Sequence, residues 1–159
     1  MMLVDNLRIV DATAQAATTL CALIHAAFAG YRDVLDPPSG AHAETPETIA
    51  GKLAHGGGLL AYVDDVPVAG VVYQPQKTHM YLGRLAVLPD YRGRGIGQRL
   101  VEGVEARART LGLPSIQLGV RLQLPGNQAF FERLGYRVIS AHAHAGYAEP
   151  TYYYLEKRL

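Results

Sequence analysis

The chain has 159 residues, of which 49% are hydrophobic and 18% are charged, and its formal net charge at pH 7 is +1. This length and composition predict one globular domain, residues 1–159, with a sizeable core. A near-neutral charge argues against a broad nucleic-acid-binding face, and no long uncharged apolar run could span a membrane. Cys21 is the one cysteine, so it cannot form an internal disulfide, and we expect it to be buried in the core. We also expect the protein to be cytoplasmic.

The first third of the chain predicts one strand and two helices. The expected elements are, in order, a strand over 7–10, a helix over 14–28, a loop over 31–40 and a helix over 45–53. Apolar residues at helical spacing define the first helix, and Gly30 is expected to end it. Thr45 and Pro46 suit the cap and the first turn of the second helix.

The rest of the chain alternates between strands and helices. The expected elements are strands over 59–63, 66–73 and 79–88, a helix over 96–111, a strand over 115–120, a helix over 125–134, and strands over 136–140 and 151–155. Asp64 and Asp65 are expected to join the first two of these strands in a tight hairpin. The resulting order, β-α-α-β-β-β-α-β-α-β-β, predicts one mixed, twisted sheet with helices on both faces, an α/β or α+β layered fold.

The stretch 82–100, LGRLAVLPDYRGRGIGQRL, carries the strongest functional signal. It predicts a strand, a glycine turn and a helix that opens directly out of the turn. Such a junction directs free backbone N–H groups at one point, and Gly93, Gly95 and Gly97 have no side chains to obstruct a ligand. The segment 84–109 holds six arginines against three acidic residues. We therefore predict a small anionic ligand, a diphosphate.

The glycine spacing separates this junction from two common phosphate-binding loops. A dinucleotide fingerprint fails because Gln98 stands where a third glycine is needed, and the Gly-Lys-Ser/Thr end of a Walker loop is missing. The remaining pattern is Arg92-x-x-Gly95-x-Gly97, after a Leu-Ala-Val strand and a proline and before an amphipathic helix. This pattern resembles the acyl-CoA-binding motif of the GNAT acyltransferase superfamily, whose element order is also similar over nearly the whole chain.

The resemblance implies a single mixed, mostly antiparallel sheet and acetyl-CoA as the acyl-donor cosubstrate. It places the diphosphate on the glycine loop, and the pantetheine on the preceding strand and on Asn127. An alternative interpretation of Asn127 is a helix N-cap. The cofactor-binding residues that we predict are Leu85, Ala86, Val87, Arg92, Gly93, Arg94, Gly95, Ile96, Gly97, Gln98, Asn127 and Phe130.

The later stretch GNQAFFERLGY resembles a second GNAT motif, N-x-x-A-x-x-x-Y-x-x-x-G-F, with departures. In that family the tyrosine protonates the departing CoA thiolate, but its position here holds Phe131. The asparagine position holds Leu124, and Asn127 lies about one helical turn further on, on the same face. The glutamate that often serves as base corresponds approximately to Gly83. Candidates for the missing acid–base role are His79, Tyr81, His144 and Tyr147.

The loop after the first helix frames the acceptor pocket in GNAT proteins. This resemblance implies acceptor contacts from Phe28, Tyr31, Ser39 and His42. The strand residues 152–154 are all tyrosines, and we expect one ring in the core and two at a surface or dimer contact, with a substrate cage as the alternative. We predict no metal site, because His142 and His144 have no evident third ligand.

The resemblance implies an acyl-CoA-dependent N-acetyltransferase that moves acetyl from acetyl-CoA to a primary amine by direct attack. The acceptor is expected to be a small molecule or a peptide, with no nucleic acid or membrane as partner, and a homodimer is compatible with the tyrosine-rich last strand. The alternative is a catalytically inactive acyl-CoA-binding sensor or interaction module, which the missing tyrosine and glutamate favour. A nucleotide-binding protein is a third candidate. A covalent route through Cys21 is disfavoured, since Cys21 is far along the chain from the CoA motif.

Overall fold

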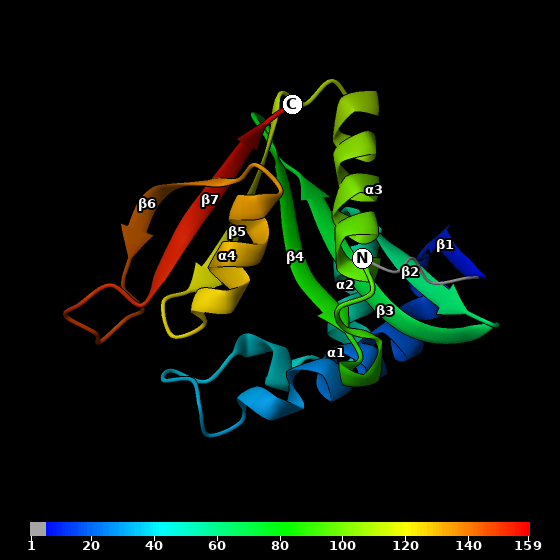
Figure 1. Ribbon diagram of the computed structural model, residues 1–159, viewed down its shortest axis with the longest axis horizontal. Helices are drawn as coiled ribbons and strands as arrows, with labels where there is room; N and C mark the ends of the chain where they lie inside the picture. The colour runs from blue at the N-terminus through cyan, green and yellow to red at the C-terminus, as the bar shows by residue number, and fades with distance from the viewer. Residues whose placement is uncertain (1–5) are drawn as a thin grey trace.

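The structure is a computed structural model, and residues 6–159 of it are described. Its helices and strands are β1 (Leu7–Asp11), α1 (Ala17–Phe28), α2 (Pro46–His55), β2 (Gly57–Val63), β3 (Val66–Pro75), β4 (Met80–Val87), α3 (Ile96–Thr110), β5 (Ser115–Arg121), α4 (Pro125–Arg133), β6 (Arg137–His142) and β7 (Tyr152–Arg158). Short 3-10 helices are η1 (Ala14–Ala16), η2 (Ala29–Tyr31), η3 (Gly40–Ala43) and η4 (Pro89–Tyr91). The predicted order of elements and the layered fold are confirmed (Figure 1).

Seven strands form one sheet in the order β1-β2-β3-β4-β5-β7-β6. Every neighbouring pair is antiparallel except β4 and β5, which run parallel and pair only at Met80–Ile116 and Tyr81–Gln117. Beyond these residues the two strands diverge, so that a V opens in the middle of the sheet, with the α1 end of the molecule below it (Figure 1). The facing edges of β4 and β5 are therefore available to a ligand.

A β-bulge bends β4 beside this opening. Val72 of β3 pairs with Gly83, whereas Gly70, two residues earlier on β3, pairs with Ala86, three residues later on β4. The extra residue lets β4 turn away from β5. Arg84 lies in the bulge and has a φ of +52°, which is uncommon for a residue other than glycine.

Helices cover both faces of the sheet. α3 packs on one face together with Phe131 of α4, and α1 and α2 pack on the other. α3 buries residues that recur every three or four positions, as the sequence predicts: Ile96, Leu100, Val101, Val104 and Ala108. α2 begins with the expected cap, in which Thr45 and Thr48 form a capping box. Cys21 is buried, as predicted.

The structure differs from the predicted elements mainly at their ends. The α-helical part of the first helix begins at Ala17, after η1, and the predicted loop 31–40 meets 3-10 turns at both ends. The last strand extends to Arg158 because β7 pairs with β5 along its whole length. Within residues 6–159, no helix is both long and apolar enough to cross a bilayer.

Candidate active site

The glycine loop and the start of α3 line a cavity of about 660 Å³. Gly93 and Gly95 have φ angles of +75° and +81°, a left-handed backbone that glycine adopts without strain. The backbone N–H groups of residues 93–98 donate no hydrogen bond to any part of the described chain. The first N–H groups of a helix have no intrahelical partner, and the helix dipole makes their surroundings favourable for an anion. The loop therefore has the chemistry of a phosphate site.

Most of the predicted cofactor-binding residues line this cavity. They are Leu85, Val87, Arg92, Gly93, Gly95, Ile96, Gly97, Gln98, Asn127 and Phe130. Ala86 lies elsewhere, because it is only 2% exposed and packs against α1 and α2. Arg94 is outside the lining as well, and its guanidinium lies 5.1 Å from the centre of the Tyr91 ring.

Arg92 holds the glycine loop in place. Its Nε donates to the carbonyl of Val87 at 3.1 Å, and its Nη2 donates to the carbonyl of Ala27 at 2.7 Å. These bonds join the loop to the end of β4 and to the C-terminal end of α1. Since carbonyl groups carry no full charge, the positive charge of Arg92 is still available to an anion in the cavity.

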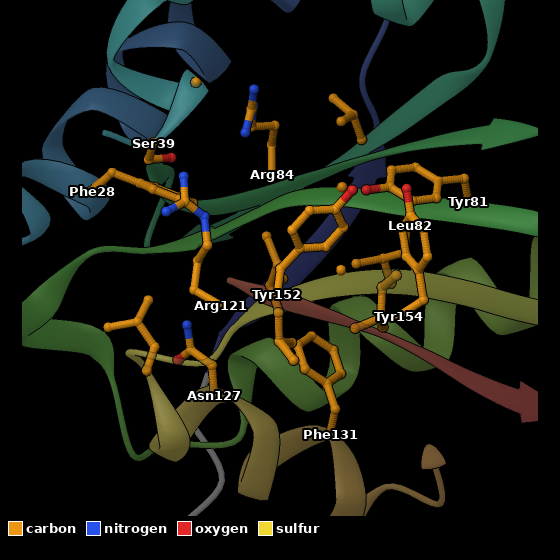
Figure 2. A pocket seen from close by; sticks show the side chains of 18 of the residues that line it. Phe28, Ser39, Tyr81, Leu82, Arg84, Arg121, Asn127, Phe131, Tyr152 and Tyr154 are labelled. Carbon is orange, nitrogen blue, oxygen red and sulfur yellow. The ribbon is translucent and has the colours of Figure 1, made fainter. Parts of the chain in front are cut away.

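A second cavity of about 500 Å³ lies in the V between β4 and β5 (Figure 2). It shares a set of lining residues with the first cavity, namely Phe28, Tyr31, Leu85, Asn127 and Phe131. The two cavities therefore adjoin each other, with these five residues between them. A ligand that binds its phosphates at the glycine loop could extend along β4 into the V, where a second molecule could meet it.

The comparisons with known proteins agree with this architecture. The family model described as the acetyltransferase (GNAT) family matches residues 24–136. The chain belongs to this family. GNAT enzymes use acetyl-CoA, so the cosubstrate expected from the sequence is that of the family.

Individual relatives add detail. A protein of Bacillus subtilis (strain 168) that is named as a putative acetyltransferase is 31% identical over 94 residues, which are 59% of this chain and 60% of that protein. This chain thus spans less than two thirds of that relative. The PaiA N-acetyltransferase of Thermoplasma acidophilum, solved in complex with coenzyme A, superposes with a TM-score of 0.82 at 16% identity, over 96% of this chain and 99% of that one. A GNAT family acetyltransferase of Elizabethkingia anophelis with acetyl-CoA bound has a TM-score of 0.74 at 20% identity, over 98% and 99% of the chains.

The acceptor residues expected from the GNAT resemblance separate into two groups. Phe28, Tyr31 and Ser39 line the V cavity. The rings of Phe28 and Tyr31 meet edge to face, with centroids 5.6 Å apart. His42 does not line either cavity, and neither of its buried ring nitrogens has a partner in the described chain. Burial, followed by the charges of Arg32 and His25, lowers the pKa of His42.

The acid–base candidates also fall into two groups, one inside the V cavity and one outside it. Tyr81 and His144 line the V cavity, whereas His79 and Tyr147 do not. Burial is the main cause that lowers the pKa of His144, and the nearby charge of Arg121 lowers it further, so the imidazole is neutral at pH 7. Burial raises the pKa of Tyr81, which therefore stays protonated.

The two excluded candidates make other contacts. The Tyr147 hydroxyl donates a hydrogen bond to the carboxylate of Asp36, which raises the pKa of Tyr147. His79 lies 3.0 Å from the hydroxyl of its neighbour Thr78 in the turn before β4.

The tyrosines of β7 differ from the expectation of two rings at a surface or dimer contact. Tyr153 packs against the core, as expected of one ring, but Tyr152 and Tyr154 line the V cavity. Alternate residues of a strand face opposite sides, so these two rings share a side. Gly119 of β5 pairs with Tyr154 and has no side chain to fill the space beside it. This placement is compatible with the alternative, rings that enclose a substrate, and a dimer contact stays a prediction.

Sequence patterns did not indicate the basic residues of the V cavity, Lys52, Arg84 and Arg121. Their positions depend on the bulge in β4 and on the divergence of β5, neither of which has a local sequence signature. Glu44 lies behind two of them with 5% of its side chain exposed, and it accepts hydrogen bonds from Arg84 Nε at 2.8 Å, from Thr48 at 2.7 Å and from Lys52. Burial alone would raise the pKa of Glu44, but these bonds outweigh it and lower the pKa to about 2.

Metal-ligating side chains do not gather in the described part of the chain. Among residues 6–159, no three His, Cys, Asp or Glu side chains are grouped in a way that could hold a metal ion. His142 and His144 instead pack their rings on Tyr152, with centroid distances of 5.4 and 4.8 Å.

Proposed function

We propose that this GNAT protein transfers the acetyl group of acetyl-CoA to a primary amine by direct attack. The observation that carries the proposal is that a phosphate site and the V cavity adjoin each other, with five lining residues in common. Relatives of the same fold bind coenzyme A or acetyl-CoA, which supports the same ligand here. Holding an amine beside a thioester where the two cavities meet would supply the proximity on which such a reaction depends.

The glycine loop would hold the diphosphate, and β4 the pantetheine arm. The N–H of Leu88 donates to the carbonyl of Val68 at 2.9 Å, toward β3. Because successive residues of a strand point in opposite directions, the N–H of Val87 is directed into the opening, where it can donate to a carbonyl of the ligand. Asn127 and Phe130 line the same cavity from α4 and would contact the arm near the thiol.

The acceptor amine must lose a proton before it can attack. An ordinary alkyl amine with a pKa of about 10.4 is almost entirely protonated at pH 7. We assign the base to His144, which lines the V cavity and is neutral because of its surroundings. The neutral amine nitrogen then forms a bond to the acetyl carbon and the carbon–sulfur bond breaks. The second proton of the nitrogen passes to the departing thiolate, so coenzyme A leaves as the thiol.

A second candidate function is a sensor that binds acyl-CoA without catalysis. Phe131 favours it, because this buried ring stands in the usual tyrosine position and has no proton to donate to a thiolate. The neutral His144 and the tyrosines of the V cavity favour catalysis. Release of free thiol from acetyl-CoA, measured over a panel of amines, separates the two functions.

The experiment combines this assay with calorimetric titration of acetyl-CoA. We expect binding, and thiol release that depends on the amine. Gly95→Ala should weaken acetyl-CoA binding at least about 10-fold, because alanine disfavours φ +81° by roughly 1–2 kcal/mol and a loop that relaxes from this conformation no longer directs its amides at the diphosphate. Gly51→Ala is the matched control, because a Cβ at this helical glycine meets nothing within 4 Å. Binding without thiol release would support the sensor, and absence of binding would refute both functions.

A further inference from the structure

The V cavity has basic side chains in its lining and no acidic ones. Among its lining residues, the titratable side chains are Lys52, Arg84, Arg121 and His144 together with tyrosines, and no aspartate or glutamate of the described residues is part of the lining. Glu44 lies directly behind Lys52 and Arg84 and balances one of these two charges. Lys52, Arg84 and Glu44 together therefore leave a net positive charge on the side of the cavity that faces α1 and α2.

Arg121 adds a charge that no carboxylate among residues 6–159 neutralises by direct contact. Its Nη1 and Nη2 donate to the carbonyls of Pro37 and Pro38 at 2.7 and 3.1 Å. A guanidinium has five N–H groups, so these bonds fix its plane and leave donors for a ligand. The nearby Asp36 is exposed, accepts the Tyr147 hydroxyl and is not part of the lining.

Arg84 also has donors to spare. Its Nε bonds to Glu44, and neither Nη atom makes a hydrogen bond within the described chain. The guanidinium lies close to the backbone of Gly40, where a Cβ would be 2.9 Å from Nη2 of Arg84. The local backbone therefore leaves space for this group at the edge of the cavity.

The two arginines lie on a different side of the cavity from two of its tyrosines (Figure 2). Arg84 and Arg121 lie on the side of Ser39 and Phe28, and Tyr81 and Tyr154 lie across from them (Figure 2). Phe28 belongs to both cavities, so the arginine side lies next to the point where the donor's acetyl group would arrive. If the arginines hold one group of the acceptor, an amine close to that group would lie at this point. The rest of the acceptor would then extend toward the tyrosines.

We infer that the acceptor is a free amino acid, whose carboxylate binds Arg84 and Arg121 and whose side chain faces the tyrosines. This inference rests on the proposed function. Guanidinium groups match a carboxylate in shape and charge, and their bonds to it are among the strongest hydrogen bonds of proteins. The same charges repel a polyamine. They also lower the pKa of an amine bound beside them, which favours the neutral amine that attacks.

The first test compares each amino acid with its own amide, which lacks only the negative charge. Alanine, leucine and phenylalanine are assayed against their amides and against spermidine by thiol release. The amide has an amine pKa of about 8 and is thus the more reactive nucleophile at pH 7, so any preference for the acid comes from recognition. We expect kcat/KM for the best acid to exceed that of its amide by at least about 10-fold.

Equal or better use of every amide, or a preference for spermidine, would overturn the inference while leaving acetyl transfer intact. Acetyl-CoA binding without transfer to any amine would instead refute the proposed function. The two failures are therefore distinguishable on the unaltered protein.

The second test changes the arginines. Arg121→Gln and, separately, Arg84→Gln should lower the acid-to-amide ratio of kcat/KM by about 10- to 100-fold, through KM for the amino acid, with little change in KM for acetyl-CoA. Arg158→Gln is the matched control, because that side chain is 80% exposed and lies on β7 outside both cavities. Melting temperatures establish that each variant is folded. If Arg121→Gln and Arg84→Gln are both folded and neither changes the acid-to-amide ratio of kcat/KM, the carboxylate site is wrong.

Discussion

At the scale of single residues, His144 shows how surroundings prepare a side chain for proton transfer. Its ring lies 4.8 Å from the ring of Tyr152, centre to centre, and its backbone N–H and Nδ1 both approach the hydroxyl of Thr151. Burial and the charge of Arg121 lower its pKa below the ordinary 6.5. A base with a lowered pKa is unprotonated over the whole neutral range, so it is ready to accept a proton at pH 7.

This reasoning predicts a specific pH dependence. In the unaltered protein, kcat/KM at saturating acetyl-CoA should fall on the acid side through a pKa below 6.5, because protonated His144 cannot accept a proton. His144→Gln should lower kcat by about 100-fold and move the acid limb up to the pKa of the acceptor amine, since only the neutral amine then reacts. His79→Gln is the control, since His79 lies outside both cavities. An acid limb at the same pH in the His144 variant as in the unaltered protein would contradict the assignment of His144 as the base.

Cys21 shows the opposite effect of burial. Burial is the main cause that raises the pKa of this thiol, and the charges of Glu44 and Glu47 raise it further. The thiolate, which is the nucleophilic form, is therefore disfavoured at neutral pH. Cys21 also lines neither cavity. Both observations agree with direct transfer and argue against an acetylated cysteine.

At the scale of elements, a cluster of Glu44, Thr48, Lys52 and Arg84, here the Glu44 cluster, joins the start of α2 to the bulge of β4. Thr48 and Lys52 follow Glu44 by four and eight residues, so both lie on the helix face above it, and Arg84 approaches from the sheet. The cluster thus fixes Arg84 at the cavity while it closes the end of the loop after α1. Removing the carboxylate would affect both stability and the acceptor site.

The cluster predicts acid sensitivity. The pKa of Glu44 is about 2 in the folded protein against an ordinary 4.5, so its contribution is complete above 4.5 and is lost as pH falls toward 2. By linkage this contribution is roughly 3 kcal/mol at most. Glu44→Gln should lower the free energy of unfolding at pH 7 by about 1–3 kcal/mol, and by much less at pH 2.5, as measured by urea titration.

Glu149→Gln is the control for this comparison, because Glu149 is exposed and makes no ion pair with other described residues. An equal loss of stability at both pH values in the Glu44→Gln variant would mean that the carboxylate charge contributes nothing, and that the substituted amide merely packs poorly.

The elements that sequence predicted well are those with local signals. The helix expected over 96–111 is α3 at Ile96–Thr110, since its glycine cap and its apolar spacing lie within the helix itself. The glycine loop was also predictable, because its amides are freed by adjacent residues. The acceptor site was not. Arg84 faces the cavity through a bulge in the β3–β4 pairing that has no local sequence signature, and Tyr152 through its pairing with β5, a strand that is distant in the sequence.

At the scale of the whole molecule, two parts of the sheet meet at the site. β1 to β4 form one antiparallel part and β5 to β7 form the other, and their strands are joined by only two residue pairs of β4 and β5. The core continues across this junction, because Phe131 and Leu155 pack in the same cluster as α3. The V is closed where these two pairs join β4 to β5 and is open beyond them.

A ligand that spans the glycine loop and the V contacts both parts of the sheet, so it should stabilise the entire fold. At a concentration of 100 times its dissociation constant, acetyl-CoA would add about 2.7 kcal/mol to the free energy of unfolding, since it binds the folded chain only. For a protein of this size the melting temperature should rise by about 5–10 °C. Differential scanning calorimetry at several acetyl-CoA concentrations measures this rise, with ATP as the control ligand. A larger rise with ATP would identify a nucleotide site instead.

Hydrogen exchange can locate the same binding event in the chain. In the free protein the amides of residues 93–98 have no hydrogen-bond acceptor in the described structure, so they should exchange quickly. Saturating acetyl-CoA should slow them, because the diphosphate becomes their acceptor. The Asp64–Asp65 turn is exposed and lines neither cavity, so it should stay fast and serves as the internal control. If both segments remain equally fast with ligand bound, the diphosphate lies elsewhere and the assignment of the glycine loop is wrong.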